Sequence, residues 1–319
     1  MKQRIRDFLF TKDGLVFSVV DYVPQEYYGG GEGVRAMLRY VPDEKGERMN
    51  KKRGIRYRKL GTGEAFEYMK LHHPGWVYDV FAVPYDEIQE YLRPEKELER
   101  VCQEDEKVSR LIDTLEDMGV RRKSMGITGS RLTSLSQANS DIDLVVYGKE
   151  WWRAREILSE VISTDQSRPN LKPIPEDVWQ KIYKKRVPEI GFQEFLIHEV
   201  RKYNRAMWED TYFDLLYVGE GEYKPPKYRR KVEKRTITGM VLSAKYAFDS
   251  PSVFEIEHPM VDRVLSYTHT YAGQVFEGEI LEARGMLEET EKGIQLVVGT
   301  TREAKGEWIR SLTLLEGCK

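Results

Sequence analysis

The segment 129–146 constrains the fold of this chain more than any other part of the sequence. Gly129 and Ser130 follow a short apolar run, and after a spacer of ten residues Asp141 and Asp143 alternate with apolar residues. Alternate side chains of a strand point to opposite faces, so both carboxylates lie on one face while their apolar neighbours enter a core. The segment therefore predicts two acids that can share a divalent cation, beside a turn whose backbone amides and hydroxyl suit a phosphate group.

This spacing resembles the signature of the nucleotidyltransferase superfamily typified by DNA polymerase beta, kanamycin nucleotidyltransferase and the CCA-adding enzymes. Within that superfamily, the chain resembles the predicted nucleotidyltransferases of archaea. The signature is Gly-Ser, a spacer, and Asp-apolar-Asp-apolar; here Ser140 precedes the first acid in the form Ser-Asp-Ile-Asp-Leu. The resemblance implies an α+β fold whose nucleotidyltransferase core is a mixed β-sheet with helices. From the residues alone, the alternative is an exposed strand end whose acids only increase solubility.

The resemblance also implies a third carboxylate on an adjacent strand. Asp214 is the first candidate, because the run 211–218 is rich in aromatic and apolar residues and predicts a buried strand. Glu194 is the second candidate, and its surroundings predict a helix. A strand-edge acid without a metal role remains the alternative for Asp214.

The implied chemistry is the transfer of a nucleoside monophosphate from a nucleoside triphosphate to an acceptor hydroxyl, with release of pyrophosphate. Asp141, Asp143 and Asp214 would be the catalytic metal ligands for two Mg²⁺ ions, with Mn²⁺ as a substitute. Asp214 could also accept the proton of the acceptor hydroxyl. The sequence does not identify the acceptor, because an RNA 3′ end, a small molecule and a protein hydroxyl all fit the same catalytic centre.

Three residues at the predicted turn are the candidates for nucleotide binding: Gly129, Ser130 and Arg131. Many superfamily members continue with a small residue, a basic residue and glycine, whereas Arg131 and Leu132 follow here, so the turn can differ locally. A solvated helix residue is the alternative interpretation of Arg131.

The pattern of apolar residues predicts three modules. Residues 1–93 predict a β-rich N-terminal module, residues 94–223 the nucleotidyltransferase catalytic domain, and residues 224–319 a C-terminal small β barrel or sandwich. At the start of the second module, an apolar stripe at helical spacing predicts one helix from Pro94 to Met118, capped by Gly119.

Two runs of basic residues are candidates for contacts with a polyanion such as RNA. The run 48–59 fits a solvated loop better than a polyanion contact, and the denser run 224–235 is the best sequence argument for an RNA acceptor. The net charge of −2 offers no overall attraction for nucleic acid. The oligomeric state is not constrained.

The two cysteines, Cys102 and Cys318, predict neither a disulfide framework nor a zinc site, and no segment reads as a signal peptide or a membrane span. These features predict a cytoplasmic protein without membrane contact. Two function classes follow: a Mg²⁺-dependent nucleotidyltransferase, or a non-catalytic nucleotide- or RNA-binding protein on the same fold.

Overall fold

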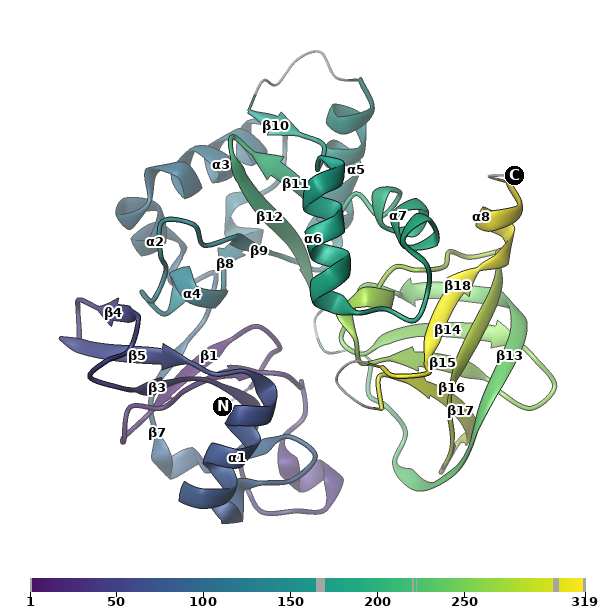
Figure 1. The fold of residues 1–319 in the computed structure, drawn as a ribbon, viewed down its shortest axis with the longest axis horizontal. Helices are drawn as coiled ribbons and strands as arrows, with labels where there is room; N and C mark the ends of the chain where they lie inside the picture. Colours follow the sequence, from purple (N-terminus) through teal and green to yellow (C-terminus); the bar gives the residue numbers. More distant parts are fainter. Residues whose placement is uncertain (1, 165–169, 220, 222, 301–303, 318–319) are drawn as a thin grey trace. The chain divides into compact units, whose positions relative to one another are not determined.

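The computed structural model of the protein describes residues 2–164, 170–219, 221, 223–300 and 304–317. These residues contain helices and three β-sheets (Figure 1), which confirms the predicted α+β class. The chain divides into two compact units, one of residues 1–172 and 206–222 and the other of residues 173–205 and 223–319. The three sheets fall within the three predicted module ranges, but residues 173–205 group with the C-terminal sheet.

The first sheet occupies the N-terminal part of the first unit. Its strands follow the order β4-β5-β3-β2-β1-β7, and β6 pairs with β3. The elements are β1 (Phe8–Thr11), β2 (Val16–Val19), η1 (Gln25–Tyr28), β3 (Val34–Pro42), β4 (Arg48–Asn50), β5 (Ile55–Lys59), α1 (Thr62–His72), η2 (Pro74–Trp76), β6 (Phe81–Val83), η3 (Tyr85–Glu87) and β7 (Ile88–Leu92).

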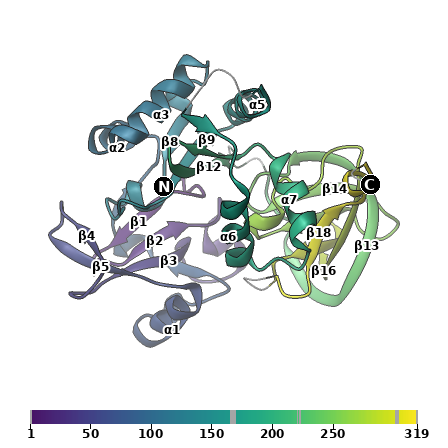
Figure 2. The ribbon, with the colours of Figure 1, turned by 45° about the horizontal axis from the view of Figure 1, so that its top comes forward.

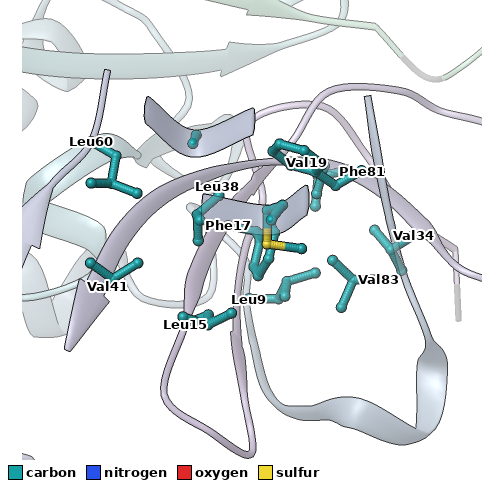
Figure 3. Close-up of a cluster of buried hydrophobic side chains, with 13 residues drawn as sticks. Leu9, Leu15, Phe17, Val19, Val34, Leu38, Val41, Leu60, Phe81 and Val83 are labelled. Atoms are coloured by element: carbon teal, nitrogen blue, oxygen red, sulfur yellow. The ribbon is translucent and has the colours of Figure 1, made fainter. Parts of the chain in front are cut away.

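Both faces of this sheet are buried. On one face Phe17 and Leu38 belong to a cluster that includes Met69 of α1, and Figure 3 shows the strand side chains that form it. On the opposite face Phe8, Phe10, Val16 and Tyr40 pack with two residues of the predicted catalytic module, which are Leu132 and Leu135. The N-terminal sheet is therefore packed against the segment that follows Gly129.

Two local expectations were wrong. The run 48–59 is the β4–β5 hairpin rather than a solvated loop. The single helix expected over 94–118 is broken into α2 (Leu98–Glu104) and α3 (Glu106–Asp117). At the break, Asp105 has extended backbone and its side chain accepts from the amides of Lys107 and Val108 at 3.1 and 3.2 Å, so a cap starts a new helix where the apolar stripe continues.

The second sheet has the order β10-β11-β12-β9-β8. Strand β9 is parallel to β12 and antiparallel to β8. In Figure 2, α2 and α3 lie on one side of these strands and α5 on the other, and Trp151 of α5 donates from Nε1 to the carbonyl of Leu215 at 3.2 Å. The elements are η4 (Arg122–Ser124), β8 (Met125–Ile127), α4 (Gly129–Leu132), β9 (Ile142–Tyr147), α5 (Lys149–Thr164), β10 (Leu171–Lys172), β11 (Arg205–Trp208) and β12 (Thr211–Val218).

The second unit combines the helices of residues 173–205 with the C-terminal sheet and a short helix near the end of the chain. The backbone amide of Ser311 donates to His198 Nε2 at 2.9 Å, which connects α7 to the sheet. The elements are α6 (Glu176–Arg186), α7 (Phe192–Val200), β13 (Tyr228–Tyr246), β14 (Ser252–Glu257), β15 (Arg263–Ser266), η5 (His269–Tyr271), β16 (Ile280–Thr290), β17 (Gly293–Val298), β18 (Trp308–Ser311) and α8 (Leu312–Gly317).

The C-terminal strands close into a ring. Their order is β13-β14-β15-β17-β16-β18, and an additional pairing joins β13 to β16. The long strand β13 bends far enough to pair with both β14 and β16. Strand β15 ends at Ser266 and η5 follows, because the chain turns at Thr268, whose side chain accepts from the amide of Thr270. No helix among the described residues is long and apolar enough to cross a membrane.

Candidate active site

Two of the predicted acids lie side by side on the second sheet. Strands β9 and β12 are parallel, and their register places Asp214 directly opposite Asp143. The flanking residues Ile142, Leu144, Phe213 and Leu215 are buried and point to the opposite face. The alternation seen in each sequence segment therefore directs both carboxylates to one face of the sheet.

The backbone at Gly129 requires glycine, both for its φ angle and for its close approach to Asp143. Its φ is +70°, and a Cβ added to it would lie 2.1 Å from Oδ2 of Asp143. The amide of Thr128 donates to the carbonyl of Asp143 at 2.9 Å. Only glycine allows the turn to approach the carboxylate this closely, so the turn and the acid lie in direct contact.

The other predicted residues surround this pair. Asp141 is exposed and lies one residue before β9, close enough to Asp143 to affect its ionisation, while Ser130 is partly exposed in α4. Across the described parts of the chain, no three His, Cys, Asp or Glu side chains already form a metal-binding group. The structure therefore provides an adjacent pair, Asp143 and Asp214, with Asp141 at its edge.

The pair is electrostatically unfavourable when both members are ionised. Burial and the neighbouring charge of Asp214 raise the pKa of Asp143 to about 6, although the nearby cation Arg6 opposes the shift. The hydroxyl of Tyr212, two residues away on the same face of β12, donates to Oδ1 of Asp214 at 2.8 Å. A cation placed between the two carboxylates would relieve their repulsion.

Two arginines of the N-terminal module, Arg6 and Arg39, interact electrostatically with this site, and the sequence analysis missed them. Arg6 is partly buried, and burial lowers its pKa although Asp143 and Asp214 attract its charge. Its backbone is anchored to the turn, because Thr128 Oγ1 donates to the Arg6 carbonyl at 2.5 Å. The positive charge of Arg39 further lowers the pKa of Arg6 and opposes the rise in the pKa of Asp143. No local motif marks these residues, since only tertiary packing brings them to the site.

Arg131 is buried rather than solvated, which corrects one interpretation of it. Its guanidinium forms an ion pair with Asp105 and donates to the carbonyl of Ser140 at 2.8 Å. It thus connects the cap of α3 to the residue preceding Asp141. These contacts position the loop that carries Asp141, and a phosphate contact from Arg131 stays a prediction.

A polar cavity of about 300 Å³ lies beside this loop. Its lining residues are Asp105, Lys107, Arg131, Ser136, Gln137 and Ala138. The cavity is therefore next to the short segment that joins α4 to the carboxylate strand.

Glu194 lies elsewhere. It is in α7 within the second compact unit, and its Oε1 is 3.5 Å from Nη1 of Arg310 in the same unit. Of the two candidates for the third carboxylate, Asp214 is the one whose strand pairs with the strand of Asp143.

The donor atoms at the pair suit Mg²⁺. Mg²⁺ prefers oxygen ligands and is usually held by one or two carboxylates together with substrate phosphates, so a complete protein cage is not required. The adjacent carboxylates of Asp143 and Asp214 would supply such a partial site, and a bound cation would offset the repulsion that contributes to the raised pKa of Asp143.

Comparisons with known proteins agree with this geometry. A model of the nucleotidyltransferase domain matches residues 108–201, which include the Gly129 turn and Asp143 but not Asp214. An uncharacterized protein of Methanocaldococcus jannaschii is 37% identical over 347 residues, covering 97% of this chain and 99% of the relative. No solved structure matches. With the carboxylate pair, the glycine turn and full-length similarity established, the chain belongs to the family of nucleotidyltransferase-domain proteins that includes this archaeal relative.

Proposed function

We propose that this protein is a Mg²⁺-dependent nucleotidyltransferase of the polymerase beta type, which transfers a nucleoside monophosphate from a nucleoside triphosphate to an acceptor hydroxyl. The observation that carries the proposal is the register of β9 and β12, which pairs Asp143 with Asp214 beside Gly129. A strand end that only increased solubility would not need two adjacent, partly buried carboxylates on one face.

The reaction forms one bond and breaks another at the α-phosphorus. The acceptor oxygen attacks that phosphorus, the bond to the bridging oxygen breaks, and pyrophosphate leaves. Bound Mg²⁺ would neutralise the charge that builds up on the attacking and leaving oxygens. Asp143 and Asp141 would hold the metal–triphosphate, while Asp214 would orient the acceptor hydroxyl and accept its proton.

The buried ion pair of Arg131 supports a positioning role in this scheme. By holding the Ser140 carbonyl at 2.8 Å, the guanidinium limits the freedom of the residue that follows. A carboxylate on a restrained loop loses less conformational entropy when it binds a ligand.

Among acceptors, we infer that an RNA 3′ end is the first to test. The basic side chains of the run 224–235 are all exposed, namely Lys224, Lys227, Arg229, Arg230, Lys231, Lys234 and Arg235. Some are already paired, as in Arg230 with Glu289 at 2.7 Å and Lys234 with Glu307 at 3.0 Å. RNA binding through this run would weaken as salt concentration rises, because displaced counterions drive it.

The test is incubation of the purified protein with α-labelled nucleoside triphosphates, Mg²⁺ and pooled cellular RNA. Labelled RNA is the expected product. Asp143→Asn and Asp214→Asn should remove the product, and Asp117→Asn, at an exposed position of α3 in the same unit, is the matched control. Saturable nucleotide binding without any product from RNA, small-molecule or protein pools would favour the alternative, a non-catalytic nucleotide- or RNA-binding protein.

A further inference from the structure

Arg6 occupies a backbone conformation that an arginine rarely adopts. Its φ is +72°, in the left-handed region that glycine enters without strain. The conformation is held from both sides, because the Arg6 amide donates to the Val19 carbonyl at 3.1 Å and the Arg6 carbonyl accepts from Thr128 Oγ1. Because an arginine is strained at a backbone position that favours glycine, we expect its side chain to have a function there.

Packing brings this residue over the carboxylate sheet. Ile5, which precedes Arg6, is buried in a cluster with Val145 of β9 and Val218 of β12. The hydroxyl of Tyr22, another neighbour of the Arg6 charge, accepts from the amide of Gly219 just beyond β12 at 2.9 Å. Arg6 is thus anchored to both strands that carry the acids.

Arg39 lies at an irregularity in β3. Strands β2 and β3 shift register between Val16 and Phe17, which pair with Tyr40 and Leu38, so that Arg39 and Tyr40 together stand opposite Val16. Such a β-bulge turns a side chain away from the regular alternation. Tyr40 beside it packs with Leu132 of α4, which orients this part of the sheet toward the glycine turn.

The charges explain what the arginines could bind. Without ligands, two guanidiniums partly balance the carboxylates of Asp141, Asp143 and Asp214. Once divalent cations neutralise those carboxylates, as the proposed function requires, the arginines have an excess of positive charge and attract an anion. A guanidinium donates in a planar fork that matches two phosphate oxygens.

We propose that Arg6, in the turn before β1, and Arg39 of β3 form a phosphate-binding subsite opposite Asp143 and Asp214. This inference rests on the proposed function, since it assigns the subsite to a substrate of the same centre. The phosphate belongs either to the polyphosphate tail of the nucleotide or to a phosphate-bearing acceptor. The N-terminal sheet is then a wall of the active site as well as a scaffold.

Binding experiments test the subsite without turnover. Calorimetric titration with Mg²⁺ and the α,β-methylene analogue of ATP is compared for the wild type, Arg39→Ala and Arg6→Gly. The glycine variant removes the guanidinium while accepting the left-handed backbone, so it should fold as well as the wild type. Arg58→Ala is the matched control, because Arg58 lies on β5 of the same sheet and pairs with Asp43 at 3.1 Å.

If the subsite holds the nucleotide tail, both variants should bind the analogue about tenfold to a hundredfold more weakly, as expected for a lost charged hydrogen bond, and Arg39→Lys should recover part of the loss. If it holds an acceptor phosphate, analogue binding should be unchanged, and inorganic phosphate should bind the analogue-saturated wild type but neither variant. Folded variants that match the wild type in both titrations would overturn the subsite.

These outcomes are separable from the test of the proposed function. Arginine-dependent binding without nucleotidyl transfer would leave the subsite standing and remove the enzymatic proposal. Transfer by a wild type whose arginine variants bind both ligands normally would do the reverse.

Discussion

Two carboxylates of this protein, one in each compact unit, have opposite electrostatic surroundings. Burial alone would raise the pKa of Glu199 in the second unit, but the attraction of Arg205, Lys202 and Arg186 lowers it to about 2. Asp143 in the first unit has a carboxylate as its strand neighbour, and its pKa rises to about 6. Glu199 has the surroundings of a structural ion pair, whereas Asp143 has the surroundings that the proposed cation-binding role requires.

The contrast extends to what each carboxylate stabilises. Glu199 forms ion pairs with Lys202 and Arg205, and Nζ of Lys202 also donates to the Thr270 carbonyl at 2.9 Å, which joins the end of α7 to the C-terminal part of its unit. Asp143 makes no comparable contribution to packing, since its carboxylate faces Gly129 and Asp214. A protein tolerates such repulsion where ligand binding later offsets it.

The largest effect is expected from removing the charge of Asp143. Asp143→Asn should lower nucleotidyl transfer at least about a thousandfold, because several kcal/mol of charge stabilisation are lost. Its thermal stability without metal should equal or exceed that of the wild type, since a repulsion disappears. Transfer assays and melting curves check both points, and a clear loss of stability would mean that the acid is structural after all.

Glu199→Gln should show the opposite behaviour. It leaves three cations without their buried partner and should lower the free energy of unfolding by about 3–5 kcal/mol. Urea unfolding measures the loss, with Glu176→Gln on the exposed face of α6 as the matched control. A variant as stable as the wild type would remove the distinction drawn between the two carboxylates.

Another acid, the buried Asp7, gives a pH dependence of stability. Burial raises its pKa to about 7, although Arg4 and the Tyr91 hydroxyl, which donates at 3.0 Å, oppose the shift. The folded state then holds a proton that the unfolded state releases near pH 4, so stability should fall as pH rises from about 4 to about 7, by a few kcal/mol.

Asp7→Asn should remove most of this pH dependence and make the protein more stable than the wild type at pH 8. Urea unfolding at pH 5, 6, 7 and 8 checks the sign. Equal slopes for the wild type and the variant would contradict the assignment to Asp7.

The smallest effect is expected from Mg²⁺ alone. A partial site of two carboxylates should bind the ion weakly, so millimolar Mg²⁺ should raise the melting temperature of the wild type by about one to three degrees. The shift should be reversed by EDTA and absent in Asp143→Asn. An equal shift in that variant would place the ion elsewhere.

The sequence predicted the strands that carry the candidate acids. The apolar pattern predicted that Asp143 and Asp214 lie on strands. In the structure Asp143 lies on β9 and Asp214 on β12. The glycine in the predicted turn is explained by its φ of +70° and its approach to Asp143. The helix pattern failed at Asp105, because a capping side chain interrupts a helix without disturbing the apolar stripe around it.

The sequence alone determined which segments carry the acids, because strand alternation and a glycine turn are properties of a few neighbouring residues. Only the tertiary structure decided that β9 and β12 pair in the register that joins Asp143 to Asp214, that Arg131 is buried, and that the charges of Arg6 and Arg39 act on Asp143. Such contacts join residues far apart in the chain, and they depend on how buried apolar surfaces fit together, which no local pattern records.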